Sequence, residues 1–337
     1  MARATVYNNI TSAESIEQIL PENMELIKDF LAYMHSLDRS DNTIYQYQKD
    51  LEIFFVYNMQ HNDNKRFTDI TKRELVRFQN HALTEWRWSP KRIRTVKSAI
   101  SSLSNYIEDI LDDEYPGFRN IISKIESPAN VPVLEKSVFT DTELQGLLNH
   151  LTATREYRKA ATLALAMYSG RRKSELPRFK TEYFTDDNII FNTFWKTPEK
   201  VKTKGRGSKG KQINLYVLKS GFEPYLKRWM NERRRKGIES PWLFPNSRDH
   251  SKAMTITTLD DWADEFTEYL HKDFYWHSMR HYFTTMMARA EVPDSVIQDI
   301  ISWDSADMVR LYTDISTDEN IGRYFGEGRL KKSKYAV

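Results

Sequence analysis

Cysteine is absent from this 337-residue chain, and no run of eighteen apolar residues occurs in it. The first absence excludes disulfide bonds, thiolate metal ligands and a cysteine nucleophile. The second gives no indication of a transmembrane helix. The opening residues "MARATVYNNI" also lack the apolar stretch of a signal peptide. We therefore expect a cytoplasmic protein with no membrane partner.

A large excess of charge of one sign is also missing, because 50 Lys and Arg nearly balance 47 Asp and Glu. The distribution is uneven, since residues 1–130 hold 16 basic against 19 acidic residues and the positive excess lies in the remainder. Three basic clusters, which start at Arg87, Lys196 and Lys227, suit a surface that meets phosphates along part of one face. Solvated helix faces and a flexible hairpin explain the same clusters equally well.

The N-terminal part of the chain has the pattern of a compact all-helical domain. Apolar residues recur at helical spacing through residues 22–57, in two segments split by "DRSDN". Thr71, followed by Glu74 three residues later, predicts a helix that begins with a capping box. Ser89 and Pro90 predict the start of a long amphipathic helix, because proline is favoured at the first helical position.

Two prolines in "SPANVPVLEKS" interrupt this pattern, and we expect an extended linker at residues 127–138. It would join a domain at 1–126 to one at 139–337. The second domain starts with helices and changes, between residues 181 and 218, to short β-branched and aromatic runs separated by turn residues. We predict a small antiparallel sheet there with its hairpin tip at 205–210. The fold is thus expected to be mainly α, with a mixed, mostly helical second domain.

Two clusters of nitrogen-rich side chains indicate an anion site. The stretch "HSMRHYFTT", which begins at His277, puts two histidines and an arginine before a segment apolar enough to be buried. The stretch "YSGRRKSEL" puts Arg171 and Arg172 at a helix junction. A helix start attracts anions through its dipole and its free N–H groups as well as through such side chains. The pair of clusters therefore suits a multiply charged anion.

These clusters, followed by "IISWDSADMVRLYTD", resemble the motifs of the tyrosine recombinase (phage integrase) family. That family has a G-x-R-x-S-E-L box, an H-x-[LM]-R-H box, and a tyrosine nine residues beyond an L-G-[HW] turn. Here Tyr312 lies nine residues beyond Trp303. The segments "SDNTIYQYQKDLEIFFVY" and "WSPKRIRTVKSAISSLSNYI" resemble the family's core-binding domain. The resemblance covers almost the whole chain.

The resemblance implies a SAM-like core-binding domain and a catalytic domain that close around duplex DNA. About twenty residues precede the first expected helix, which favours a Xer- or Cre-like architecture without an arm-binding domain. The implied activity is site-specific recombination through a 3′-phosphotyrosyl intermediate and a Holliday junction, for integration or excision of a phage or mobile element. A homo-tetramer on two DNA sites, accessory directionality factors, no metal and no cofactor are implied as well.

The resemblance also implies the roles of the site residues. Tyr312 would attack the phosphate, while Arg172 and Arg280 would clamp its non-bridging oxygens as planar groups that stay charged. The implied catalytic set is Arg172, Lys204, His277, Arg280, Trp303 and Tyr312, with Glu175 and His281 in support.

Some of these roles stay open at the level of sequence. His277 would either accept the proton of Tyr312 or donate a hydrogen bond to a phosphate oxygen. Trp303 stands where most members of the family have a second histidine, and an indole donates one hydrogen bond but cannot shuttle a proton. Glu175 is expected to orient its neighbours. His281 would hold the loop together or be an ordinary buried histidine.

The general acid in the family is a lysine on a β-hairpin. Direct alignment of "GRGSKGKQINL" puts Arg206 at that position, where an arginine cannot give up a proton usefully. A hairpin two residues longer puts Lys204 there, and we predict Lys204, with Lys202 and Lys209 as alternatives. The chain departs from the family in three other positions, at Arg171 for an apolar residue, Ser302 for glycine and Asn214 for proline.

DNA contacts by the first domain follow from the resemblance alone, and most would touch phosphates. The expected DNA-binding residues are Thr43, Tyr45, Tyr47, Lys49, Arg92, Arg94 and Lys97, together with Arg206 and Lys209 of the hairpin.

Three other functions are weighed against recombination. A type IB topoisomerase would share the cleavage chemistry, and a catalytically inactive site-specific DNA-binding protein would explain Arg206 in place of the lysine. A helical protein–protein adaptor gives no reason for Arg172, His277 and Arg280 to occur together.

Overall fold

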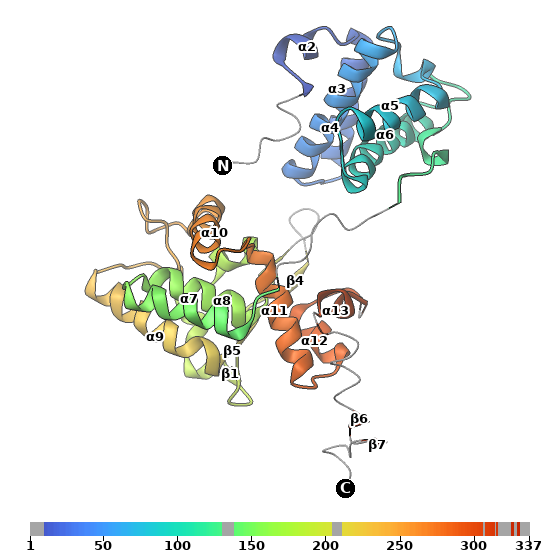
Figure 1. The fold of residues 1–337 in the computed structure, drawn as a ribbon. Helices are drawn as coiled ribbons and strands as arrows, with labels where there is room; N and C mark the ends of the chain where they lie inside the picture. The colour runs from blue at the N-terminus through green and yellow to red at the C-terminus, as the bar shows by residue number, and fades with distance from the viewer. Residues whose placement is uncertain are drawn as a thin grey trace. The chain divides into compact units, whose positions relative to one another are not determined.

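The computed structural model of the chain describes residues 10–129, 138–203, 211–305, 307–313, 315, 325–326 and 329–330. They fall into two compact units, one that ends at residue 129 and one that begins at residue 138 (Figure 1). Each unit has its own hydrophobic core. Within the described ranges, no helix is long and apolar enough to cross a membrane.

The first unit is entirely helical in the part that the structure describes. Its elements are α2 (Ala13–Glu17), α3 (Pro21–Ser36), α4 (Asp41–His61), η1 (Phe67–Asp69), α5 (Lys72–Thr84), α6 (Pro90–Ile110) and η2 (Ile122–Lys124). The predicted capping box is present, since Thr71 Oγ1 accepts from the N–H of Glu74 and the Glu74 carboxylate accepts from the N–H of Thr71. Ser89 caps α6 and Pro90 is its first residue, as predicted.

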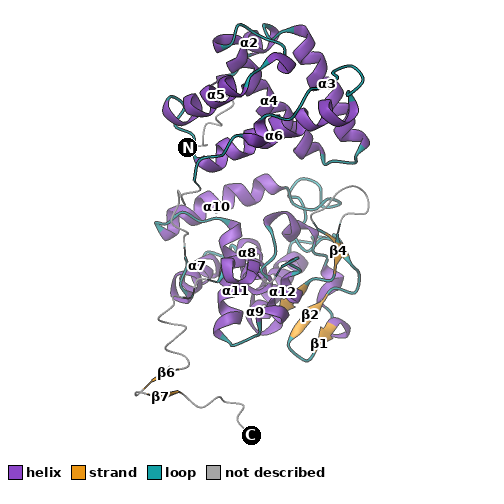
Figure 2. Ribbon diagram, turned by 90° about the vertical axis from the view of Figure 1, so that its right-hand side faces the viewer, coloured by secondary structure: helices purple, strands orange, loops and turns teal. Residues whose placement is uncertain are grey.

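The second unit combines helices with two small antiparallel sheets between residues 189 and 218 (Figure 2). Its longer helices are α7 (Asp141–Ala153), α8 (Tyr157–Ser169), α9 (Lys219–Arg235), α10 (Ile256–Leu270), α11 (Trp276–Arg289), α12 (Asp294–Ile301) and α13 (Asp307–Tyr312), and the 3-10 turns are η3 (Lys173–Arg178), η4 (Thr181–Phe184) and η5 (Asp186–Asn188). A further pair of strands, β6 (Phe325–Gly326) and β7 (Arg329–Leu330), lies near the C-terminus. The predicted fold class, mainly α with a mixed second unit, is confirmed.

The predicted single sheet is divided into two. Strands β1 (Ile189–Ile190), β2 (Phe194–Lys196) and β5 (Tyr216–Leu218) form one sheet in the order β1-β2-β5, and β3 (Val201–Lys202) pairs with β4 (Gln212–Ile213) in the other. The strand pairing is interrupted between β4 and β5, where the N–H of Leu215 donates to the hydroxyl of Thr197 and not to a main-chain carbonyl. Residues 204–210, which connect β3 to β4 and include the predicted hairpin tip at 205–210, lie outside the described residues.

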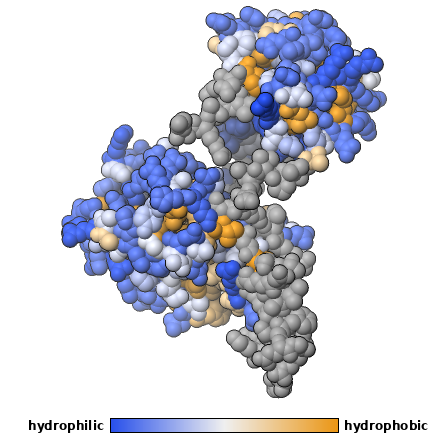
Figure 3. Space-filling view, viewed as in Figure 1, coloured by the Kyte–Doolittle hydropathy of each residue, from blue (hydrophilic) through white to orange (hydrophobic). Residues whose placement is uncertain are grey.

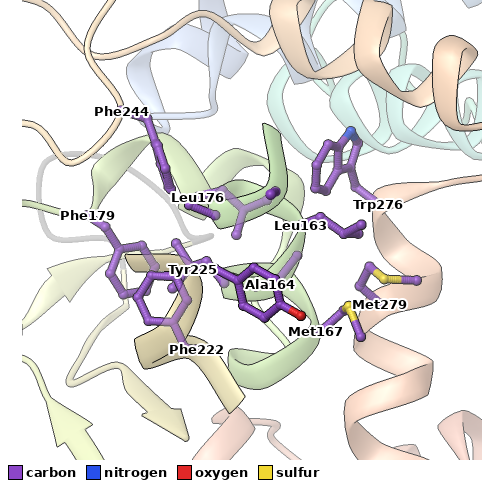
Figure 4. Close-up of a cluster of buried hydrophobic side chains, with 14 of the residues drawn as sticks. Leu163, Ala164, Met167, Leu176, Phe179, Phe222, Tyr225, Phe244, Trp276 and Met279 are labelled. Carbon is purple, nitrogen blue, oxygen red and sulfur yellow. The ribbon is translucent and has the colours of Figure 1, made fainter. Parts of the chain in front are cut away.

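Helix α8 is the centre of the second unit. Eight of its residues in succession, from Ala160 to Met167, are buried. They pack against α9, α7 and α11, and Figure 4 shows Leu163, Ala164 and Met167 among side chains of α9 and α11. A buried helix of small and aliphatic residues places its C-terminal end, and the residues that follow it, at a defined point beside α11.

A smaller cluster of buried side chains joins α11 to the two helices after it. It contains Phe283, Met287, Ile297, Ile301, Trp303 and Val309. These residues hold α12 and α13 against α11. The outer surface of both units is largely hydrophilic on the face shown in Figure 3, as expected when most large apolar side chains lie in these cores.

Candidate active site

The turn after α8 carries two arginines with different surroundings. It begins at Gly170, whose φ of 59° lies in the left-handed region. Arg171 is fully buried, and its Nε donates to the carbonyl of Ser169 at 3.1 Å while Nη2 donates to that of Ile300. Burial lowers the pKa of this guanidinium to about 10, so it stays charged at neutral pH. The side chain of Arg172 is 30% exposed, which makes it the arginine of this turn that can reach a ligand.

Glu175 holds Arg172 in place. Its carboxylate is buried in η3 and accepts from the N–H of Arg172 at 3.1 Å and from its Nη1 at 3.0 Å. A charged hydrogen bond of this kind restricts the long side chain to one orientation. This is the geometry expected of a carboxylate that orients an arginine.

Arg280 ties three separate segments together. It comes from α11 and is buried, and its Nη1 donates to the carbonyl of Gly170 at 2.9 Å while Nη2 donates to that of Ile301 at 3.3 Å. Its Cζ also lies 4.8 Å from the ring centroid of Trp303, within the range of a cation–π contact. The second arginine of the expected clamp is therefore held at the junction of α8, α11 and α12.

His277 lies in the first turn of α11, one turn before Arg280. Its ring is 5.7 Å from that of His281, edge to face. Burial, and then the neighbouring positive charges of His281, Arg280 and Arg172, lower the pKa of His277 to about 4. These neighbours show that both arginines of the expected clamp lie near His277, whose ring is partly desolvated although the residue keeps an exposed surface. A histidine in such a field is neutral at neutral pH.

Trp303 follows a turn that needs left-handed backbone. Ser302 ends α12 with φ 62°, a conformation in which glycine is unstrained, so the turn explains the glycine of the family motif, and nothing in the structure explains the serine. The N–H of Trp303 donates to the carbonyl of Gln298 at 3.0 Å, and the indole is buried against the small cluster beneath Arg280. Its observed contacts are those of a packing residue for Arg280.

The β3–β4 hairpin reaches the same place through a residue that sequence analysis missed. Lys211 Nζ lies 2.5 Å from Asp304 Oδ1 and donates to the carbonyl of Ser302 at 3.2 Å. The carbonyl of Lys211 accepts from the N–H of Thr203 at 2.8 Å, which closes the base of the hairpin. The hydrogen bond and charge of Lys211, and then the charge of Arg172, lower the pKa of Asp304. Lys211 belongs to the segment "GRGSKGKQINL", but its pairing with Asp304 could not be predicted without the fold.

The predicted hairpin residues Lys204, Arg206 and Lys209 lie outside the described residues. Lys202 is exposed on β3, and the next residue, Thr203, is buried. Side chains alternate along a strand, so Lys202 is on the opposite side from Thr203.

Tyr312 is the last residue of α13, which packs against α11 and α12. Its backbone is described, and its side chain is outside the description. The structure thus brings Arg172, His277, Arg280 and Trp303 together and ends α13 beside their helices. Among the described residues, no group of three or more His, Asp or Glu side chains could hold a metal ion.

The predicted DNA contacts on α4 fall on two kinds of surface. Tyr45 is 53% exposed, and Lys49 Nζ lies 5.5 Å from its ring centroid while also pairing with Glu52 at 2.9 Å. Thr43 is near the start of the helix, hydrogen-bonded to Ser40 at 2.8 Å. Tyr47 instead packs against the core of the unit. Tyr45 and Lys49 are the members of this group that can meet a ligand.

The predicted contacts on α6 also differ from one another. Arg94 is exposed and donates to the carbonyl of Pro128 at 2.8 Å. Arg92 is partly exposed and pairs with the buried Asp50 at 2.6 Å. Lys97 is buried and donates to Gln79 Oε1 at 3.0 Å and to the carbonyl of Ile125 at 2.7 Å. The structure argues against a phosphate contact for Lys97, because its ammonium holds the segment after α6 onto the unit.

Comparison with known proteins gives family matches to both units. Residues 137–319 match the phage integrase family, and residues 26–116 match the phage integrase N-terminal SAM-like domain. The SPbeta prophage-derived recombinase-like protein YomM of Bacillus subtilis (strain 168) is 30% identical over 254 residues, covering 74% of this chain and 72% of that protein. A tyrosine recombinase of Thermosipho africanus (strain TCF52B) is 24% identical over 307 residues, covering 88% and 96%.

Solved structures share the fold at lower identity. The lambda integrase (75–356) dimer bound to a COC′ core site has a TM-score of 0.63 at 13% identity, covering 91% of this chain and 99% of that one. The Tn1549 transposon integrase in complex with circular intermediate DNA has a TM-score of 0.61 at 15% identity, covering 89% and 99%.

Proposed function

Because the chain belongs to the phage integrase family, we propose that it is a site-specific tyrosine recombinase that cuts and rejoins duplex DNA through a 3′-phosphotyrosyl intermediate and a Holliday junction. The observation that supports this most directly is the convergence of Arg172, Arg280 and His277 beside the helix that ends in Tyr312. The prophage origin of the Bacillus relative favours integration or excision of a phage or mobile element as the biological role.

In this proposal the phenolic oxygen of Tyr312 attacks the phosphorus, and the bond to the 5′-oxygen breaks. Arg172 and Arg280 compensate the charge of the five-coordinate transition state. His277 is neutral before DNA binds, so it can accept the proton of Tyr312 or donate one hydrogen bond to a phosphate oxygen. The departing 5′-oxygen takes its proton from a hairpin lysine, for which we propose Lys204.

The energy of the broken phosphodiester is kept in the tyrosyl ester, so the freed 5′-hydroxyl of a partner strand can reverse the step without ATP. Two duplexes, each bound by two copies of the chain, would undergo four such strand exchanges by way of the Holliday junction. In the first unit, Tyr45 and Arg94 are exposed and Lys49 is partly exposed, and these side chains would contact the DNA backbone. Accessory proteins that set direction would act on this tetramer.

Covalent trapping in cells tests the proposal. The chain is expressed beside its native flanking DNA, cells are lysed in SDS, and the DNA that stays attached to the protein is sequenced, with Tyr312→Phe as the control. Adducts at one short inverted repeat, absent in the variant, are expected. Adducts spread without sequence preference would instead indicate a type IB topoisomerase. Sequence-specific binding without any adduct from the wild-type chain would leave a catalytically inactive DNA-binding protein.

A further inference from the structure

We propose that Arg171, the buried neighbour of the clamp arginine Arg172, is a positioning residue for DNA cleavage. Its guanidinium sets the place of the α12–α13 connection relative to the turn after α8. The inference rests on the proposed recombinase function, and it adds a residue that makes no contact with the phosphate itself.

The main evidence is a pair of parallel cross-links between two helix ends. Arg171 bridges the carbonyls of Ser169 and Ile300, which are 131 residues apart in the chain. Arg280 bridges the next carbonyl on each side, those of Gly170 and Ile301. Two guanidinium groups therefore join successive residues at the end of α8 to successive residues at the end of α12.

These carbonyls are suited to such a bridge. The last carbonyls of a helix have no partner within the helix and carry its negative dipole end. Arginine offers five donors in a rigid plane, so one side chain can serve two carbonyls at a fixed separation. A lysine would offer a point charge without that fixed fork.

Stability alone does not account for Arg171. The residue is fully buried, no carboxylate is hydrogen-bonded to it, and its Nη1 has no hydrogen-bond partner among the described residues. Removing a charge from water costs several kcal/mol, and a well-packed apolar side chain is often the more stable choice at such a place. What the arginine provides, and an apolar residue cannot, is a fixed register between the two carbonyl groups.

The residues that Arg171 bridges lie only a few positions along the chain from the proposed reacting groups. Ile300 and Ile301 lead directly into the left-handed turn at Ser302, which places Trp303 under Arg280. Helix α13, which ends at Tyr312, begins at Asp307. Arg172 follows Arg171 directly on the other side of the bridge. Arg171 thus couples one arm of the clamp to the segment that carries the nucleophile, and misplacement by about 1 Å in such a site can cost roughly 10²-fold in rate.

The test compares three variants in the full-length chain. Arg171→Lys keeps the charge but loses the fork, and Arg171→Leu removes both. Arg233→Lys is the matched control, because Arg233 is also buried and also donates to main-chain carbonyls, those of Ser240, Trp242 and Leu243, at the far end of α9. Single-turnover cleavage and binding are measured on the duplex recovered by covalent trapping, and amide hydrogen exchange is measured over residues 298–305.

We expect Arg171→Lys to cleave about 10²-fold more slowly than wild type while its Kd for the duplex changes less than about threefold. The amides of Ser302 and Trp303 should exchange faster in this variant, and neither change should occur in Arg233→Lys. Arg171→Leu should lose at least as much rate as Arg171→Lys if it folds. Should it not fold, Arg171→Lys decides the question alone.

Cleavage by Arg171→Lys at the wild-type rate would overturn the inference. So would a loss of rate with exchange over residues 298–305 unchanged, since the bridge would then not act through this segment. Absence of any adduct from the wild-type chain would contradict the proposed function instead. In that case hydrogen exchange still tests the bridge, because it requires no DNA.

Discussion

The guanidinium of Arg280 lies over the indole of Trp303, with Cζ 4.8 Å from the ring centroid, and donates to the carbonyl of Ile301, two residues before that indole. The ring supports one face of the arginine while the carbonyl holds its edge. An aromatic face attracts a cation and needs no proton to do so. This contact gives Trp303 a role at its position that requires no proton transfer.

Shortening Trp303 should therefore affect both folding and cleavage. We expect Trp303→Ala to lower the free energy of unfolding by about 3–5 kcal/mol and Trp303→Phe by much less, because phenylalanine keeps an aromatic face. Cleavage by Trp303→Phe should stay within about tenfold of wild type, whereas Trp303→Ala should be far slower. Chemical denaturation and single-turnover cleavage measure the two effects. Equal rates for both variants would show that the aromatic face does not matter.

Gly170 should not tolerate a side chain. A Cβ there would lie 2.8 Å from Cδ1 of the buried Phe283, and the backbone has φ 59°. We expect Gly170→Ala to destabilise the chain by more than the roughly 1–2 kcal/mol of left-handed strain, and to slow cleavage, because the carbonyl of Gly170 holds Arg280. Gly237→Ala is the control, with φ 61° and no atom within 4 Å of the added Cβ. Equal thermal stabilities for the two variants would contradict the packing argument.

The lowered pKa of His277 predicts a pH dependence of stability. Its pKa is about 4 in the folded chain against an ordinary value of 6.5, so the unfolded chain binds the proton first as the pH falls. The favourable contribution is complete above pH 6.5 and is lost as the pH falls toward 4. We expect His277→Gln to lack this part of the decline in DNA-free urea unfolding between pH 7 and 4. Identical slopes for the variant and wild type would show that neither burial nor the neighbouring positive charges disfavour the protonated ring.

The identity of the hairpin acid can be tested by changing the leaving group. A 5′-thiolate leaves without a proton, so a chain that lacks its general acid should cleave a 5′-bridging phosphorothiolate at nearly the wild-type rate. We expect Lys204→Ala to lose about 10²–10⁴-fold on the ordinary substrate and to recover on the sulfur one. Lys202→Ala and Lys209→Ala should show no such recovery. Recovery by either of these variants, and not by Lys204→Ala, would reassign the acid.

Two cations on α6 should respond differently to substitution. Arg94 is exposed, so Arg94→Gln should weaken DNA binding and reduce its salt dependence without loss of stability. Lys97 is buried with two acceptors, so Lys97→Met should lower the stability of the first unit and leave the salt dependence unchanged. Filter binding at several salt concentrations and thermal unfolding separate the two. A smaller salt slope for Lys97→Met would show that its ammonium does reach phosphate.

Local features of the fold could be predicted because they depend on neighbours in the sequence. The capping box of Thr71 and Glu74 and the start of α6 at Ser89 and Pro90 involve groups within three residues of each other. Helical periodicity and turn residues likewise distinguish the all-helical unit from the mixed one. The spacing of Tyr312 from Trp303 carried the family resemblance, because a motif of this kind is a local pattern.

The tertiary structure alone decided what each charged side chain does. Two adjacent arginines differ completely, since Arg171 is buried against Ile300 and Arg172 is open to a ligand beside Glu175. Lys97 is buried against its acceptors, and Lys211 pairs with Asp304. Sequence patterns could not reveal either contact, because the partners are 18 to 93 residues away. The burial of a side chain and the electrostatic field at it depend on every group that packs around it. Residue type and spacing therefore predicted a phosphate site, and only the packing of α8, α11 and α12 determined which of its side chains are buried and which stay accessible.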